Sequence, residues 1–329
     1  MPQLLDISVV ISYFNEEESI LDTLQMMDDQ TYRPLRVFMV NSSSMDDSSN
    51  RVNSWIAQDP QRKLVYKNVI KHSRYPSASM NVGIGLCETP WIAFMDCGLE
   101  FANDWLEEQV LFLTEHPDVE WVRGVGRFKG VDVVDYCATT QTYGDSRRPH
   151  NIPSSLILRS VFDRVGLFAS TRAAFDLDWA GRTEKHKIKK AVNNKVEVNY
   201  IGANFAKTWR AVARKGYLYA RASVAVPGYR RPFRIFAACA MAILLTALLP
   251  SMRILFAGAY FVLRGIIIPT RKCRGLVWAK KNPLLVVPMF MVGAILDVSR
   301  FLGLFAGICR LTYGGLHRIA GKIISRKRP

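Results

Sequence analysis

Short apolar runs alternate with segments of helical periodicity through the first part of the chain. Runs rich in branched and aromatic side chains are typical of strands buried on both faces, and they occur at Ile7–Ser12, Leu35–Val40, Lys63–Tyr66, Trp91–Met95 and Pro153–Arg159. Helices are expected between them, at about residues 48–58, 77–85 and 103–115. This alternation predicts an α/β fold with a mainly parallel, doubly wound sheet.

Polar residues follow two of these predicted strands directly. Asp96 comes after Trp91–Met95, and Gly98 then breaks the run. Asn41 comes directly after another predicted strand, Leu35–Val40. Ligands of open α/β sheets bind outside the carboxyl ends of the strands, so Asp96 is placed where a nucleotide or its metal would lie. An aspartate after a strand also caps turns, and the strand pattern alone leaves both interpretations open.

The character of the chain changes at Phe233. Phe233–Leu249 and Met252–Ile268 are two apolar blocks of about 17 residues, the short limit for a membrane-spanning helix, and they are separated by Pro250 and Ser251. A third block, Pro283–Leu304, contains Asp297 and Arg300, which share a helix face at this spacing and can pair. Charges inside hydrocarbon are costly, so we expect this block to be re-entrant or interfacial.

Charge is distributed very unevenly. The net charge is +16, yet 22 of the 44 Lys and Arg residues and one of the 28 acids lie from Lys207 onward. These basic residues flank the apolar blocks, which favours membrane headgroups as the partner over nucleic acid. Arg230 and Arg271 both belong on the cytoplasmic side, so residues 233–268 are expected to form a transmembrane hairpin. The protein is therefore expected in the inner membrane or an equivalent one, multi-pass, with its sheet domain in the cytoplasm.

Six motifs occur in order over roughly residues 6–230. They are Val9–Glu17, Val40–Asp46, Ala78–Gly83, Phe94–Gly98, Pro153–Phe168 and Phe175–Arg182. In this order they resemble the opening strand, the nucleotide loop, the Asn-containing helix, the metal-binding Asp-x-Asp, the acceptor-side strand and the catalytic-base motif of the family-2 glycosyltransferases. That family consists of inverting enzymes with the nucleotide-sugar-binding fold called GT-A.

The resemblance implies an enzyme that uses a nucleotide-sugar donor, either UDP- or GDP-linked, and a divalent cation, Mn²⁺ or Mg²⁺. Together with the apolar blocks and the charge pattern, the resemblance predicts four parts. They are a GT-A domain over residues 1–206, basic interfacial linker helices at 207–232, a transmembrane hairpin at 233–268, and re-entrant or interfacial helices with a basic tail at 283–329. Asp176 would be the catalytic base and Asp96 the metal ligand. The donor-binding residues would be Ser12, Phe14, Glu16, Asn41, Ser43, Asn81 and Asp96.

Four polar positions of the family pattern have changed in this chain. Asn41 and Ser42 replace two acids, Gly98 replaces the second metal aspartate, Phe175 replaces a glutamate and Met80 replaces an arginine. Two hypotheses therefore stand. The chain is a membrane-bound inverting glycosyltransferase acting on a lipid-linked or polysaccharide acceptor at the cytoplasmic membrane face. Alternatively, it is a degenerate binding or scaffold subunit in envelope polysaccharide assembly.

Two tryptophans, Trp121 and Trp179, could stack on a sugar or an acceptor. A buried aromatic residue is more often part of the core, and that is the role we expect for both.

Overall fold

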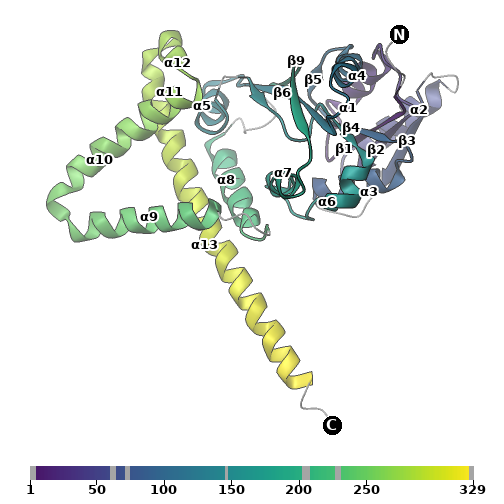
Figure 1. The fold of residues 1–329 in the computed structure, drawn as a ribbon. Helices are drawn as coiled ribbons and strands as arrows, with labels where there is room; N and C mark the ends of the chain where they lie inside the picture. Colours follow the sequence, from purple (N-terminus) through teal and green to yellow (C-terminus); the bar gives the residue numbers. More distant parts are fainter. Residues whose placement is uncertain are drawn as a thin grey trace. The chain divides into compact units, whose positions relative to one another are not determined.

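The computed structural model describes residues 5–59, 64–70, 75–144, 147–201, 208–226 and 231–325, and it divides the chain into two compact units (Figure 1). The first unit contains residues 1–131 and 145–204, and the second contains residues 132–144 and 205–329. Residues 132–144, which we expected inside the sheet domain, thus belong to the second unit. The expected boundary at 206 and 207, Arg230 and the tail residues Arg326–Arg328 lie outside the described residues.

The first unit is built on a mixed sheet, which has nine strands among the described residues. They are β1 (Ile7–Tyr13), β2 (Arg36–Asn41), β3 (Tyr66–Ile70), β4 (Trp91–Asp96), β5 (Glu100–Phe101), β6 (Trp121–Lys129), β7 (Arg148–Pro149), β8 (Ser155–Leu158) and β9 (Lys190–Ile201). Their order is β3-β2-β1-β4-β8-β6-β9-β5, with β7 paired to β6. The parallel set β3, β2, β1 and β4 brings its carboxyl ends to one edge of the sheet.

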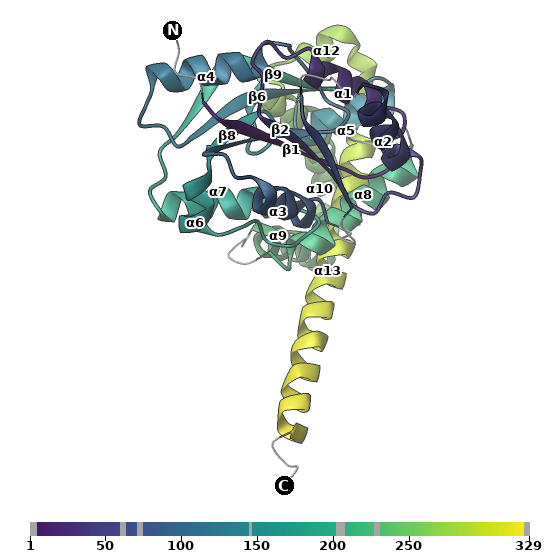
Figure 2. The ribbon, with the colours of Figure 1, turned by 90° about the vertical axis from the view of Figure 1, so that its right-hand side faces the viewer.

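Helices cover both faces of this sheet, as Figure 2 shows. They are α1 (Ile20–Asp28), α2 (Ser48–Gln58), α3 (Pro76–Leu86), α4 (Trp105–Glu115), α6 (Arg159–Val165) and α7 (Phe175–Lys185). The helices α1, α2 and α4 lie on one face, and α3, α6 and α7 lie on the other. Every residue of β1 is buried, as the continuous apolar run predicted.

Two long strands, β6 and β9, were not predicted from the sequence. They pair with each other in parallel over most of their length, with a register shift between Arg123 and Val125. Glycines at 124 and 126 interrupt the apolar pattern of β6, and Asn193 and Asn194 interrupt that of β9. The strand β3 begins at Tyr66, where the predicted run Lys63–Tyr66 ends.

The second unit is helical. It contains α5 (Val133–Thr142), α8 (Trp209–Ser223), α9 (Arg231–Leu248), η1 (Pro250–Met252), α10 (Arg253–Val262), the π-helical segment η2 (Leu263–Ile267), α11 (Ile268–Lys272), α12 (Val277–Lys281), η3 (Pro283–Leu285) and α13 (Val286–Ser325). Helix α8 packs closely along α13: a Cβ atom at Gly303 would lie 2.3 Å from the Tyr217 carbonyl oxygen, so only glycine fits at this crossing.

A polar network ties α5 to the other helices of this unit. The Arg264 guanidinium, 6% exposed, forms an ion pair with Asp297 of α13 and also donates to Gln141 Oε1 over 3.1 Å. Gln141 Nε2 in turn donates to the carbonyl oxygens of Arg264 and Met289, at 2.6 and 2.8 Å. The Tyr260 hydroxyl donates to Asp297 Oδ2 over 2.9 Å. From the sequence, Asp297 was expected to be able to pair with Arg300. In the structure it forms an ion pair with Arg264.

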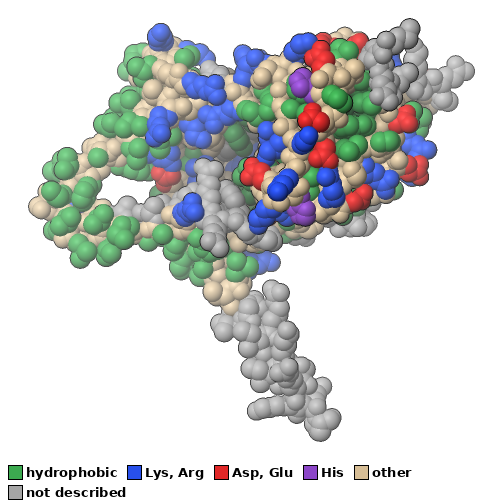
Figure 3. Space-filling model, in the orientation of Figure 1, with side chains coloured by type: hydrophobic (Ala, Val, Ile, Leu, Met, Phe, Trp, Pro, Cys, Tyr) green, Lys and Arg blue, Asp and Glu red, His purple; other side chains and the backbone are tan. Residues whose placement is uncertain are grey.

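Two stretches among the described residues are long and apolar enough to cross a membrane. They are Pro250–Lys272, with 23 residues, and Pro283–Thr312, with 30 residues. The block at 283–304, which we expected to be re-entrant or interfacial, comprises η3 and the first part of α13, a helix of 40 residues. Large apolar side chains are exposed along α9 and α10, and Figure 3 shows that this arm is mostly apolar at its surface.

The Arg264–Asp297 pair makes a testable contribution to stability. Replacing Asp297 by alanine should lower the stability of the helical unit by about 3–5 kcal/mol, because a buried guanidinium loses its carboxylate. The melting temperature of the purified full chain in detergent measures this loss. The double variant Arg264→Leu/Asp297→Leu should melt above Asp297→Ala, since it leaves no unpaired buried charge. Arg253→Ala, at an exposed arginine of the same arm, is the control, and a wild-type melting temperature for Asp297→Ala would contradict the assignment.

Candidate active site

Asp96 ends β4 at the edge where the parallel strands have their carboxyl ends. The parallel register places it beside Ser12 of β1. Two residues earlier, Phe94 is fully buried and anchors the strand in the core, whereas Asp96 itself keeps some exposure to solvent. The sheet thus presents this carboxylate at the position that the sequence analysis expected for it.

Three side chains from other parts of the first unit converge on Asp96. The pKa of Asp96 is raised to about 7, mainly by burial and also by the negative charges of Glu16 and Asp176, while a hydrogen bond with the Tyr200 hydroxyl opposes this rise. Glu16 follows β1, Asp176 lies in the first turn of α7, and Tyr200 lies near the end of β9. Tyr200 was missed by sequence reasoning, because its strand carried no recognisable periodicity.

The position of the missing second metal aspartate lies next to another carboxylate. Gly98 has a φ of 77°, and a Cβ atom there would lie 3.2 Å from Glu16 Oε2. Ser19 Oγ donates to the same Glu16 oxygen over 2.6 Å, and burial raises the pKa of Glu16. Glu16 therefore presents a carboxylate where the family pattern has its second acid.

These oxygen donors fit a divalent cation. Within the described residues, no group of three or more His, Cys, Asp or Glu side chains is placed to hold a metal ion. Mg²⁺ and similar cations are commonly held by one or two carboxylates together with substrate phosphates. Asp96 and Glu16 would hold the cation with the donor diphosphate, and its charge would stabilise the leaving nucleotide.

The nucleotide loop after β2 is fastened to the loop after β1 by many hydrogen bonds. Asn41, 3% exposed, accepts the Ser44 amide at its Oδ1 over 2.7 Å, so this oxygen shapes the loop. Ser43 takes a positive φ of 66° in the same turn. Asn15 Oδ1 accepts the Met45 amide over 2.8 Å, and the Glu16 amide donates to Ser48 Oγ over 2.8 Å. The Oδ1 atom of Asn41 is therefore engaged in shaping this loop, and the role of the loop in donor binding stays a prediction.

Two other expected donor-binding residues differ in their surroundings. Asn81 of α3 bonds the backbone of Phe168 with both ends of its amide: Nδ2 donates to the carbonyl oxygen over 2.8 Å, and Oδ1 accepts the amide over 3.0 Å. This pair of bonds ties α3 to the turn before α7. Phe14 is 46% exposed beside the β1 loop, so its ring is available to a ligand.

The candidate base Asp176 is presented by a tightly packed helix start. Trp179 of α7 is fully buried, its ring lies 5.2 Å from that of Phe168, and its Nε1 donates to the Gly166 carbonyl oxygen over 2.9 Å. Ala174 precedes the helix with a φ of 61°, a conformation that costs energy in a residue with a Cβ atom. Burial raises the pKa of Asp176, and a hydrogen bond from Asn151 opposes this rise.

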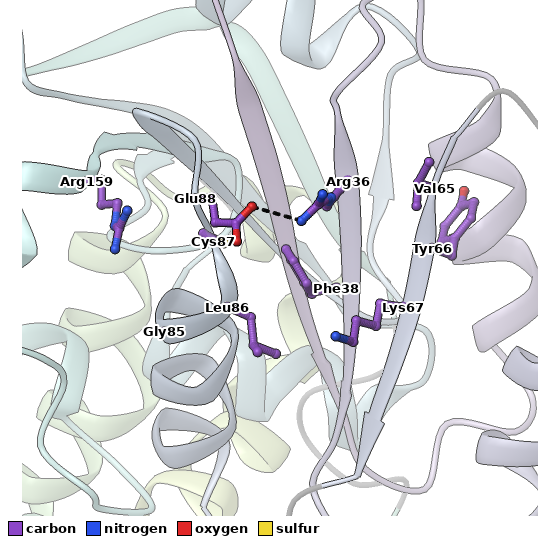
Figure 4. A pocket seen from close by; sticks show the side chains of 10 residues that line it. All are labelled: Arg36, Phe38, Val65, Tyr66, Lys67, Gly85, Leu86, Cys87, Glu88 and Arg159. Atoms are coloured by element: carbon purple, nitrogen blue, oxygen red, sulfur yellow. Dashed lines mark hydrogen bonds and ion pairs between the residues drawn. The ribbon is translucent and has the colours of Figure 1, made fainter.

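A hollow of about 540 Å³ lies elsewhere on the first unit (Figure 4). Arg36 at the start of β2, Cys87 and Glu88 after α3, and Arg159 at the start of α6 are among its lining residues. The Arg36 guanidinium is neutralised by Glu88 at 3.2 Å. This hollow lies at the amino ends of β2 and β4, away from Asp96, and we do not assign the site to it.

Comparison with known proteins agrees with this geometry. The curled, mostly parallel sheet with carboxylates at its strand ends is the GT-A fold of glycosyltransferases. The chain belongs to glycosyl transferase family 2, whose profile matches residues 8–178, just over half of its length. It is similar in structure to a mannosyltransferase of Pyrobaculum calidifontis, with a TM-score of 0.55, 16% identity and coverage of 89% of this chain and 87% of that one.

Two relatives found by sequence match this chain over part of their length. An uncharacterised glycosyltransferase of Haemophilus influenzae is 22% identical over 212 residues, which is 64% of this chain and 61% of the relative. The amylovoran biosynthesis glycosyltransferase AmsB of Erwinia amylovora is 26% identical over 107 residues, 32% of this chain and 35% of the relative. The chain therefore spans less than two thirds of the length of each.

The raised pKa of Asp96 predicts a pH-dependent cost in stability. Because the ordinary pKa is 3.8 and the folded value is about 7, the folded protein without metal should lose stability as the pH rises between these values. Asp96→Asn removes this cost and should gain roughly 1–3 kcal/mol at pH 8 but little at pH 4. Melting temperatures in the presence of a chelator measure both. Asp163→Asn, on the exposed face of α6, is the matched control, and an equal gain at both pH values would exclude this explanation.

Proposed function

We propose that the protein is a membrane-attached inverting glycosyltransferase that moves a sugar from a UDP- or GDP-linked donor to a lipid-linked or polysaccharide acceptor at the cytoplasmic membrane face. The observation that carries the proposal is the convergence of Asp96, Glu16 and Asp176 at the carboxyl ends of the parallel strands. The Asp96 and Glu16 carboxylates suit the donor diphosphate and its cation, and the Asp176 carboxylate suits a hydroxyl nucleophile.

Asp176 is the proposed base for the transfer step. An acceptor hydroxyl oxygen attacks the anomeric carbon of the donor sugar, and its proton passes to an Asp176 carboxylate oxygen. The new carbon–oxygen bond forms as the bond from the anomeric carbon to the diphosphate breaks, so the nucleoside diphosphate leaves with the electron pair. A raised pKa makes Asp176 a better proton acceptor than an ordinary carboxylate.

The donor-side proposal rests on Asp96, Glu16 and the nucleotide loop. The Pyrobaculum mannosyltransferase was solved in complex with GDP-Man and Mn²⁺, which supports a nucleotide diphosphate sugar and a divalent cation here. The substitutions Asn41, Gly98 and Phe175 favour the alternative of a degenerate binding subunit. Titration calorimetry with Mn²⁺ and a set of UDP- and GDP-sugars separates the two hypotheses. If the chain binds none of these sugars, the enzyme hypothesis is contradicted.

The membrane and acceptor parts of the proposal rest on the second unit. Its two candidate spans and its flanking basic residues suit a bilayer with anionic headgroups. AmsB is described as a polysaccharide biosynthesis enzyme, which supports a polysaccharide or its lipid-linked precursor as the acceptor.

The role of Asp176 is tested by Asp176→Asn, which keeps the shape of the side chain but removes its basicity. Transfer should fall by about 10²–10⁴-fold, the contribution typical of a general base, while donor affinity should change less than twofold. Radiolabelled sugar transfer in membranes and calorimetry on the purified chain measure the two quantities. Asp163→Asn should behave as wild type. Retention of full transfer by Asp176→Asn would remove this residue from the mechanism.

Membrane attachment is tested by flotation of the full chain with vesicles. The chain should float with vesicles containing anionic lipid and should stay attached in 1 M salt, because apolar burial, unlike surface charge, is not screened. Release by high salt alone would show a purely electrostatic contact. An alkaline phosphatase reporter after Pro329 should be inactive if the C-terminus faces the cytoplasm, and an active reporter would contradict the proposed topology.

A further inference from the structure

Arg123, Asn151 and Asp176 form a row of hydrogen-bonded side chains in the first unit. Arg123 Nη1 donates to Asn151 Oδ1 over 3.2 Å, and Asn151 Nδ2 donates to Asp176 Oδ2 over 3.4 Å. The three residues come from β6, from the segment after β7, and from the first turn of α7. The row therefore begins at the positive charge of Arg123 and ends at Asp176, the candidate base.

The chemistry of the three groups fixes the direction of the row. A guanidinium only donates hydrogen bonds, so the amide oxygen of Asn151 must face Arg123. The amide nitrogen of Asn151 then faces Asp176, where it stabilises an ionised carboxylate better than a protonated one. The opposite orientation of the amide would place two donors together at Arg123 and two oxygens together at Asp176.

The Arg123 end of the row is packed against α7, the helix that carries Asp176. Arg123 Cζ lies 5.0 Å from the centroid of the Trp121 ring, and Trp121 packs edge-to-face on Trp179 of α7 at 5.0 Å. Burial lowers the pKa of the Arg123 guanidinium, and the negative charge of Glu184, also on α7, opposes this shift. Arg123 thus has a fixed place relative to α7 and Asp176.

The remaining charged groups around Asp176 do not supply a counter-charge. Asp96 from β4 is another acid, and Glu16 lies beside it. Asp178 on α7 is already paired with Arg182 at 3.0 Å. Among these neighbours, the stabilisation of an ionised Asp176 comes from the Asn151 amide and from the backbone amides at the start of α7.

We propose that Arg123 and Asn151 are positioning residues that hold Asp176 ionised and oriented to receive the acceptor proton. This inference rests on the proposed role of Asp176 as the base. Arg123 acts through Asn151, and Asn151 acts on one carboxylate oxygen of Asp176.

The test is the pH dependence of turnover by the full chain in detergent. The probe is release of UDP or GDP from the donor that binds best in calorimetry, with water as acceptor, between pH 5 and 9. Asn151→Leu should move the acid limb of the rate profile upward by about one pH unit, because the base loses a hydrogen bond that favours its ionised form. Arg123→Met should move it less, and Arg123→Lys should restore part of the shift.

Asn151→Asp is the sharper variant, since it keeps the shape and the Arg123 contact but places a carboxylate against Asp176. It should move the acid limb further than Asn151→Leu, whereas a merely structural role predicts a smaller effect for this isosteric change. Arg164→Met, at an exposed arginine paired with Glu120, is the matched control and should leave the profile unchanged. Donor affinity at pH 8, measured by calorimetry, should stay within twofold for all variants and reports that they are folded.

The outcomes separate this inference from the proposed function. If Asp176→Asn turns over donor at the wild-type rate, the base assignment fails and this inference fails with it. If Asp176→Asn is inactive while Asn151→Asp and Arg123→Met keep the wild-type profile, the positioning role is overturned and the base assignment stands. Should Asn151→Leu not fold, the isosteric Asn151→Asp and the Arg123 variants decide the question alone.

Discussion

The site depends on an aromatic cluster that fixes α7 against β4. Phe94, two residues before Asp96, contacts Phe162 and Phe168 with ring centroids 6.0 Å apart. Trp179, three residues after Asp176, contacts the same two rings at 5.1 and 5.2 Å. Tilted and edge-to-face pairs add about 0.5–1.5 kcal/mol each beyond their burial, so the cluster is a rigid bridge between the two carboxylates. The separation of Asp96 and Asp176 is therefore set by hydrophobic packing and not by a contact between the two acids, which repel each other.

This packing gives a physical meaning to the departures from the family pattern. Phe175, in place of a glutamate, packs edge-to-face on Phe168 at 5.7 Å and so extends the cluster to the start of α7. Gly98, in place of an aspartate, leaves the space beside its Cα to the Glu16 carboxylate. Asn41, in place of an acid, turns its amide oxygen to the Ser44 amide and shapes the loop. Each substitution removes an acidic group of the family pattern, and in each case a named contact of this chain uses the position.

The sequence was sufficient for β1, β2 and β4 and for the place of Asp96 at the carboxyl end of its strand, but not for the side chains that surround Asp96. The runs that became β1, β2 and β4 are continuously apolar because both of their faces are covered, and such runs are visible without a structure. Trp121 and Trp179 are fully buried, as expected for core residues. Tyr200, Asn151 and Arg123 could not be found, because they lie in or beside β6, β7 and β9. Glycines, asparagines and a bulge conceal the period of these strands, and only their long-range pairing brings the three side chains to Asp96 and Asp176.

Chain connectivity relates these concealed strands to the helical unit. Helix α5 begins at Val133, four residues after β6 ends at Lys129, and the chain returns to the sheet at β7. Its polar residues Asp135, Thr139, Thr140 and Gln141 are buried, and for Gln141 the hydrogen-bond partners explain this burial. Gln141 bonds Arg264 and two backbone carbonyl oxygens of the C-terminal helices. In sequence, α5 therefore lies between β6, which carries Arg123, and the segment that carries Asn151. Helix α5 itself belongs to the second unit. The two units are consequently interleaved in the sequence. A cut at residue 206 would separate α5 from the C-terminal helices that it packs against.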